Sequence, residues 1–119
     1  MQAACNKLGE LRERYRSGIR LDDTTRAFNT EWLSAIELGF TLEVAEAVAH
    51  SALNRRESRG AHFRLDEYKE RDDINFLKHT VAYYSGDGAP RIDYTPVTIT
   101  KSPPKERVYG GAGKKAEMT

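Results

Sequence analysis

The 119-residue sequence has a single cysteine and lacks any long apolar run. Cys5 cannot form a disulfide within the chain, which favours a reducing, cytoplasmic setting. No stretch reaches the roughly 18 apolar residues of a membrane-spanning helix, and no apolar segment follows Met1 as in a secretory signal. The net charge of +1, from 19 basic and 18 acidic residues, provides no general attraction to nucleic acid or acidic lipid. We therefore expect one small cytoplasmic domain without membrane insertion.

Residues that could carry chemistry are sparse and scattered. His50, His62 and His79 do not have the spacing of metal ligands, and Cys5 has no nearby base that would activate its thiol. The glycine-containing motifs GDG and GGAG lack the preceding strand and following helix of a phosphate-binding loop. The sequence therefore predicts no catalytic, cofactor-binding or metal-binding residue.

Apolar residues recur at helical spacing in two stretches of the first half. Residues 1–17 carry one narrow apolar stripe between charged positions, and Gly18 is a natural end for that helix. Residues 27–56 carry two apolar stripes that together cover well over half of the helix circumference, and Gly39 is a candidate point for an interruption or bend. Because the first helix can cover only one side of the second, we expect either self-association or a further helix upstream that completes the bundle.

The second half changes character after Gly60. Residues 61–75 are highly charged and predict a loop. Residues 76–84 and 91–99 are rich in aromatic and β-branched residues and flank SGDGAP, which predicts a β-hairpin with a loop of about six residues. Pro96 places the second strand at an edge or a bulge, and the remainder predicts an extended surface tail.

Cationic side chains crowd the end of the second predicted helix. We call Arg55, Arg56, Arg59 and His62 the helix-end cluster. One interpretation is capping, because cations are favourable at a helix C-terminus and Gly60 suits the C′ position. The other is a docking patch, because arginine forks pair with carboxylates or carbonyls of a neighbouring surface. The cluster by itself leaves both interpretations open.

A resemblance to a known family rests on three stretches: NTEWLSAIELGFTLEVAEAVAHSALNRRESRGAH, RLDEYKERDDINFLKHT and ITKSPPKERVYGG. In this order they resemble the C-terminal region of the flavoprotein subunit of fumarate reductase and succinate dehydrogenase, from about residue 8 to residue 111. RRESRGAH followed by ERDDINFLKHT is specific, whereas L-aspartate oxidase has a helix similar to the first stretch. The hairpin and the PPKERVYGG tail favour the respiratory enzymes, and the sequence looks most like those of bacterial quinol:fumarate reductases.

The resemblance implies a much longer parent subunit with covalently attached FAD in an α/β domain and a capping domain over the dicarboxylate. Hydride would pass between flavin and succinate or fumarate, and electrons would continue to an iron–sulfur subunit and a quinone site. The parent complex would lie peripherally on the cytoplasmic face of the bacterial inner membrane. The family's flavin-attachment, dicarboxylate-binding and proton-donating residues lie upstream, so none is carried over to this chain.

The resemblance also implies the fold, which is mainly α. We expect an incomplete three-helix bundle over residues 1–60, with the charged loop, hairpin and tail of residues 61–119 as an extension of the same C-terminal domain. The chain is expected to be non-catalytic, to pack on the flavin domain and the iron–sulfur subunit, and to self-associate when isolated. The helix-end cluster is expected to dock on the flavin domain or on the partner subunit. Three further functions stay open. One is a free-standing helical hairpin that dimerises, and another is the C-terminal domain of a related flavoenzyme such as L-aspartate oxidase. The third is nucleic-acid binding, against which the near-zero charge and the lack of stacking aromatics weigh.

Overall fold

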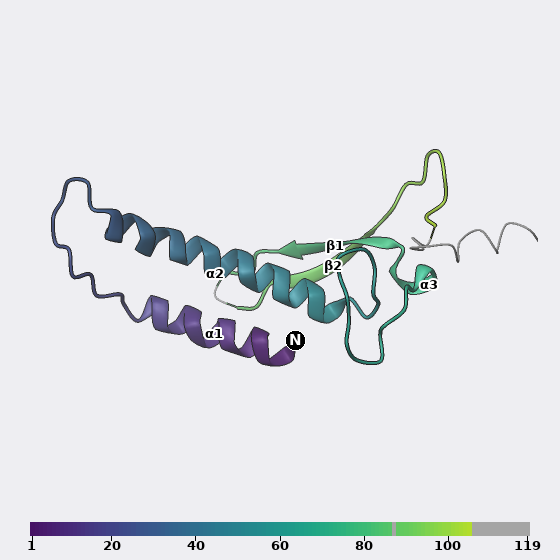
Figure 1. Ribbon diagram of the computed structural model, residues 1–119, viewed down its shortest axis with the longest axis horizontal. Helices are drawn as coiled ribbons and strands as arrows, with labels where there is room; N and C mark the ends of the chain where they lie inside the picture. The colour runs from purple at the N-terminus through teal and green to yellow at the C-terminus, as the bar shows by residue number, and fades with distance from the viewer. Residues whose placement is uncertain (87, 106–119) are drawn as a thin grey trace, which may run out of the picture.

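The computed structural model describes residues 1–86 and 88–105, which form an elongated molecule of 71 × 30 × 28 Å. Its five elements are, in chain order, α1 (Gln2–Arg16), α2 (Thr30–Asn54), α3 (Asp73–Phe76), β1 (Lys78–Tyr83) and β2 (Arg91–Pro96). The helices α1 and α2 run antiparallel side by side, and the hairpin of β1 and β2 lies along the C-terminal half of α2 (Figure 1). The predicted mainly α fold with an antiparallel hairpin is therefore confirmed. The predicted tail lies outside the described residues from residue 106 onward.

The limits of α2 are set by local hydrogen bonds and backbone angles. The Asn29 side chain accepts a hydrogen bond from the Trp32 N–H at 2.8 Å, so Asn29 is the N-cap and the helix starts at Thr30 rather than at the predicted residue 27. Phe28, with a φ of 55°, cannot belong to the helix. At the other end Arg55 is extended (φ −82°, ψ 100°), so the helix ends at Asn54.

Gly39 does not interrupt α2, which continues as a single helix through this position. Its role is instead to make room for α1. A Cβ added to Gly39 would lie 2.6 Å from the Tyr15 hydroxyl oxygen and 2.8 Å from the ring carbon that bears it. The missing side chain therefore allows the Tyr15 ring of α1 to pack directly against α2.

The exchange Gly39→Ala is expected to destabilise the helix pair, although alanine favours a helix over glycine by up to about 1 kcal/mol. The Tyr15 ring has to shift, and overpacking of this kind costs about 1–3 kcal/mol. Gly9→Ala on α1 is the matched control, because its added Cβ has no atom within 4 Å and should stabilise the helix. Urea unfolding followed by circular dichroism checks the contrast, and equal effects at the two glycines would contradict it.

The hairpin is shorter than predicted at both of its ends. Lys78 pairs with Pro96 and Tyr83 with Arg91, so residues 84–90 connect the strands. Proline has no N–H for further pairing, which is consistent with β2 ending at Pro96. The start of the first predicted strand is taken by α3, because the Asp72 side chain caps the helix by accepting from the Ile74 and Asn75 N–H groups. This short helix replaces the end of the predicted loop.

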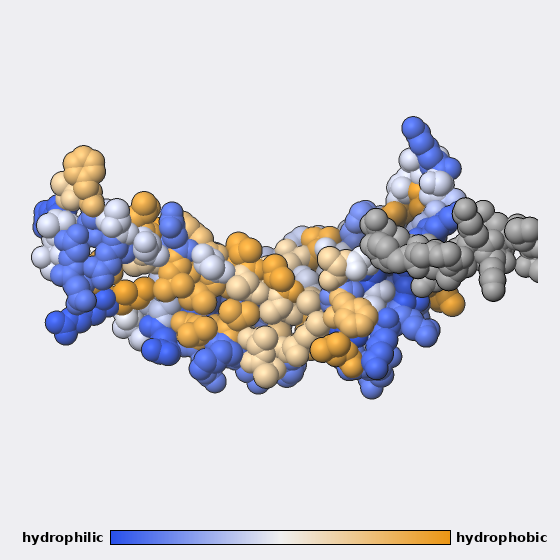
Figure 2. All heavy atoms as spheres, in the orientation of Figure 1, coloured by the Kyte–Doolittle hydropathy of each residue, from blue (hydrophilic) through white to orange (hydrophobic). Residues whose placement is uncertain are grey.

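Few apolar side chains are buried within the described part of the chain. Cys5 and Leu42 are the buried hydrophobic residues there, whereas four charged side chains are buried: Arg12, Glu46, Glu57 and Arg64. Large apolar residues of α2 face solvent, among them Phe40 (64% exposed), Val44 (64%) and Val48 (63%). Apolar surface accordingly gathers over the helices (Figure 2). None of the described helices meets the length and hydrophobicity that crossing a membrane requires. Charged groups, more than an apolar core, connect the elements.

Candidate functional site

The centre of the candidate site is a carboxylate that solvent does not reach. Glu57 is 0% exposed. Its Oε1 accepts hydrogen bonds from Arg55 Nε and Arg59 Nε, both at 2.8 Å, and its Oε2 accepts from the Asp72 N–H at 2.8 Å. We call Glu57, Arg55, Arg59 and the Asp72 N–H the Glu57 cluster. Two guanidinium groups and a backbone donor thus compensate the burial of one negative charge.

Arg55 extends the Glu57 cluster to the hairpin. Its guanidinium donates to the carbonyl oxygens of Phe76 at 2.6 Å and Lys78 at 3.0 Å, and to the Thr80 hydroxyl at 2.9 Å. The first acceptor is the last residue of α3, and the other two belong to β1. One side chain at the end of α2 therefore determines where α3 and the first strand lie.

The charges of the Glu57 cluster stabilise one another in their ionised forms. Burial acts to raise the pKa of Glu57, but hydrogen bonds from Arg59, the Asp72 N–H and Arg55 outweigh burial, so this pKa lies below its ordinary value. The hydrogen bond with Glu57 also raises the pKa of the Arg59 guanidinium. Arg59 also donates from its Nη2 to the Asp73 carboxylate at 2.5 Å, and this hydrogen bond lowers the pKa of Asp73.

The lowered pKa of Glu57 predicts that the chain loses stability in acid. The unfolded carboxyl takes up a proton near its ordinary pKa of 4.5, whereas folded Glu57 resists protonation until lower pH. The stabilisation by Glu57 is therefore complete above pH 4.5 and is lost as the pH falls through its lowered folded pKa. Urea unfolding between pH 7 and pH 3 should show this decline in the native chain. In Glu57→Gln the decline should be shallower, and an unchanged pH profile would contradict the assignment.

The loop that follows α2 is fixed by its own hydrogen bonds. Arg59 and His62 exchange two backbone bonds, of 2.8 and 3.0 Å, which close a tight turn with Gly60 at a φ of 59°. Ser58 donates to the carbonyls of Glu70 and Tyr68, from its N–H at 2.9 Å and its hydroxyl at 2.8 Å. These bonds join both ends of the segment of residues 58–70, which is the arrangement of an Ω-loop.

The end of α2 is capped by a side chain outside the predicted cluster. Arg64, which is buried, donates from Nη1 to the carbonyl oxygens of Ala52 at 3.0 Å and Leu53 at 3.1 Å. These are carbonyls that a helix terminus leaves without partners. Arg64 makes this contact, and Gly60 lies in the turn beyond the helix instead of at the predicted C′ position.

The structure divides the helix-end cluster into internal and exposed members. Arg55 and Arg59 hold Glu57, and the His62 Nε2 lies 3.1 Å from the Arg55 carbonyl oxygen. Arg56 is exposed, with its guanidinium carbon 6.0 Å from the centre of the Tyr68 ring. Three of the four predicted residues are thus brought together. Their role in docking stays a prediction.

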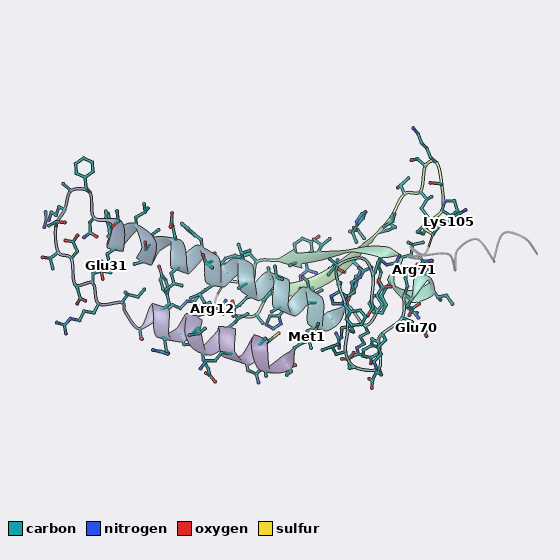
Figure 3. The ribbon with its side chains drawn as sticks, in the orientation of Figure 1. Met1, Arg12, Glu31, Glu70, Arg71 and Lys105 are labelled. Carbon is teal, nitrogen blue, oxygen red and sulfur yellow. The ribbon has the colours of Figure 1, made fainter. Side chains whose placement is uncertain are left out.

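A second buried ion pair joins the two long helices. Arg12 of α1 contacts Glu46 of α2, with Nη1 and Oε2 2.5 Å apart, and both Nη atoms lie 3.2 Å from the Gly88 carbonyl oxygen. Figure 3 shows Arg12 between α1 and α2. Helical spacing and charge along the sequence did not predict this pair. Its available signal was the position of Glu46, an acidic residue inside the apolar segment VAEAVA.

The potential metal ligands of the described part of the chain are not grouped as a metal site requires. There, no three His, Cys, Asp or Glu side chains come together as a group that could hold a metal ion. The motif GDG includes Asp87, and GGAG covers residues 110–113, so both motifs extend outside the described residues. The Glu57 cluster at the end of α2 holds the following loop and the hairpin in place. Its two arginines, Arg55 and Arg59, bind the Glu57 carboxylate of the same chain.

Residues 1–109 match the family described as the C-terminal part of the fumarate reductase flavoprotein. Among similar proteins, the fumarate reductase flavoprotein subunits of Haemophilus influenzae and Escherichia coli are 56% and 54% identical to this chain, each over 98% of it. The succinate dehydrogenase flavoprotein subunit of Coxiella burnetii is 45% identical over 90%. The chain covers only 18–19% of these three proteins, so it spans about a fifth of their length.

A solved structure supports the same relationship in three dimensions. A variant of the FrdA chain of Escherichia coli quinol fumarate reductase superimposes with a TM-score of 0.84 and 56% sequence identity, over 92% of this chain and 19% of that one. A second quinol–fumarate reductase structure, with menaquinol molecules, gives a TM-score of 0.80 and 54% identity over 87% of this chain and 18% of that one. The family resemblance expected from the sequence is confirmed. The chain belongs to the family of C-terminal domains of fumarate reductase and succinate dehydrogenase flavoprotein subunits.

Proposed function

We propose that the chain supports, without performing, the interconversion of fumarate and succinate by an FAD-containing parent subunit. The chain would pack on the flavin domain of that subunit, and electrons would pass to or from quinone through an iron–sulfur subunit. Support comes from relatives that are fumarate reductase or succinate dehydrogenase flavoprotein subunits and are about five times longer. The parent complex would lie on the cytoplasmic face of the bacterial inner membrane.

The single observation that carries a supporting role is the apolar surface of α2. Trp32, Phe40, Val44 and Val48 are each more than half exposed, although covering a large apolar side chain contributes about 1.5–3 kcal/mol. A continuous surface of this kind is typical of an interface. In the parent, the flavin domain or the rest of the bundle would cover it. In the isolated chain, the same surface would favour self-association.

The helix-end cluster would serve this interface in two ways. Arg55 and Arg59 would hold the loop of residues 58–70 in shape, because their donors are engaged with Glu57 and with backbone carbonyls. The exposed Arg56, whose guanidinium carbon lies 6.0 Å from the centre of the Tyr68 ring, would contact the neighbouring surface directly. The alternatives of a dimerising helical hairpin and of an L-aspartate oxidase domain have less support, because the relatives compared are respiratory flavoprotein subunits.

A chimera tests the proposed function. The matching region of the Escherichia coli fumarate reductase flavoprotein subunit, 54% identical, would be replaced by this chain and the complex purified. We expect bound flavin, the normal ratio of subunits and fumarate reduction, because an equivalent domain fills the same place. The subunit without any C-terminal region should lose flavin and assembly.

The isolated chain is the second arm of this test. It should show no flavin absorbance band and no fumarate reductase activity. The supporting role would be contradicted if the subunit without its C-terminal region had the same flavin content and activity as the complete subunit. A chimera that folds but fails to assemble would contradict the family function for this chain.

A further inference from the structure

A solvent-open hollow lies beside the Glu57 cluster at the end of the molecule opposite the α1–α2 connection. It has a volume of about 1280 Å³. Its walls come from residues 58–63, residues 69–71, Asp73, Pro104 and Lys105. Small-molecule pockets usually measure about 300–1,000 Å³. The volume of this hollow exceeds that range, which suits a segment of polypeptide better than a metabolite.

The charge of the hollow indicates which kind of segment it would receive. Four permanent cations line it, Arg59, Lys69, Arg71 and Lys105, against the carboxylates of Glu70 and Asp73. Asp73 is already paired with Arg59 and Arg71. Lys69 and Lys105 are exposed and form no ion pair within residues 1–86 and 88–105. The hollow thus keeps excess positive charge at its rim, which favours an acidic partner. Figure 3 shows Arg71 and Lys105 at this same end of the molecule.

One wall of the hollow is fixed in shape before any partner binds. The turn from Arg59 to His62 is closed by its two backbone bonds, and Ser58 is tied to Glu70 and Tyr68. Phe63 stands on this wall with 63% of its surface exposed. A wall that is already ordered loses little conformational entropy on binding, and an exposed aromatic residue is a common anchor of interfaces.

We propose that this hollow receives an acidic polypeptide segment, with an apolar residue against Phe63, from the part of the same subunit that lies outside these 119 residues. The inference rests on the proposed function, since relatives extend over about five times the length of this chain. A covalently connected segment binds at high effective concentration, which favours the same subunit over a separate one.

Zero-length cross-linking of the purified chimera described above tests the origin of the segment. A carbodiimide joins lysine amines to carboxylates that contact them. We expect products that join Lys69 or Lys105 to Asp or Glu of the remaining flavoprotein subunit, and their loss at high salt of about 0.5 M. Lys7 is the control, because it pairs with Glu10 at 2.9 Å and should link within α1. Links from Lys69 and Lys105 only to carboxylates of this chain, or to another subunit, would overturn the proposal.

Charge reversal provides an independent measurement. Lys69→Glu with Lys105→Glu should lower the thermal unfolding midpoint of the chimeric subunit in low salt, with little difference at high salt. Arg20→Glu with Arg26→Glu is the matched control, because it makes the same change of charge at exposed positions in the α1–α2 connection. Equal midpoints for the two variants would overturn the inference. If the chimera assembles and reduces fumarate in that case, the proposed function stands.

Discussion

Replacement of Glu57 by alanine is expected to unfold the region that joins α2 to the hairpin. The exchange leaves Arg55 and Arg59 without their shared acceptor and removes the partner of the Asp72 N–H. Removing one member of a buried ion pair costs about 3–5 kcal/mol, because the remaining charge stays buried and uncompensated. Arg55 and Arg59 are partly exposed, at 15% and 24%, and keep acceptors at Lys78 and Asp73, so we expect a loss at the lower end of this range.

Amide hydrogen exchange followed by mass spectrometry measures where the loss occurs. Protection should fall over residues 55–83, which Arg55 and Arg59 connect, and should persist where α1 packs against the middle of α2. If the whole chain unfolds, Glu57→Gln keeps the prediction testable. Its amide retains one acceptor oxygen without the charge, so its stability should lie between those of the native chain and the alanine variant.

Glu10→Gln is the matched control for Glu57. The side chain of Glu10 is 63% exposed and pairs with Lys7 across one turn of α1. Surface pairs of this kind contribute little, because water screens both charges. We expect no measurable change in unfolding for this variant. Equal stability of Glu57→Ala and Glu10→Gln would show that the Glu57 cluster does not connect the elements.

Replacement of Glu46 by alanine is expected to separate α1 from α2. The exchange leaves the Arg12 guanidinium between the helices without this carboxylate, at a cost of about 3–5 kcal/mol. Because Arg12 also contacts the Gly88 carbonyl oxygen, the connection between the strands should lose protection as well. Urea unfolding and amide exchange over residues 2–16 and 84–90 measure both effects.

A double exchange separates the loss of the pair from the loss of packing. Arg12→Met with Glu46→Leu removes both charges and keeps apolar volume, and such replacements of buried ion pairs are often neutral or stabilising. We therefore expect the double variant to be more stable than either Arg12→Met or Glu46→Leu alone. Additive losses from the two single exchanges would show that Arg12 and Glu46 contribute independently.

Local sequence signals predicted the elements but not all of their limits. Helical spacing indicated both long helices, and aromatic and β-branched residues around a glycine-rich turn indicated the hairpin. The start of α2 was missed by three residues because the Asn29 side chain caps the helix. The short helix α3 was missed because four residues carry no periodicity, although Asp72 provided a capping signal.

The sequence predicted where the candidate site lies along the chain but not which side chains contact one another there. The density of arginines at the end of α2 marked the position, and three of the four residues do converge there. Glu57 was visible between them, but its complete burial depends on Asp72, which lies 15 residues further along the chain. Arg64 and the pair of Arg12 with Glu46 likewise depend on contacts between segments that are far apart in sequence.

The sequence by itself determined the family, the mainly helical class, the hairpin and the surplus of apolar surface on α2, because each depends on residue types at short spacing. Tertiary structure alone decided which charges are buried. Glu57 and Arg55 connect α2 to the first strand, Arg12 and Glu46 connect the long helices, and Gly39 admits Tyr15. Burial and pairing of a charge depend on atoms brought together from distant parts of the chain. Residue spacing along one element does not show which distant segments come into contact.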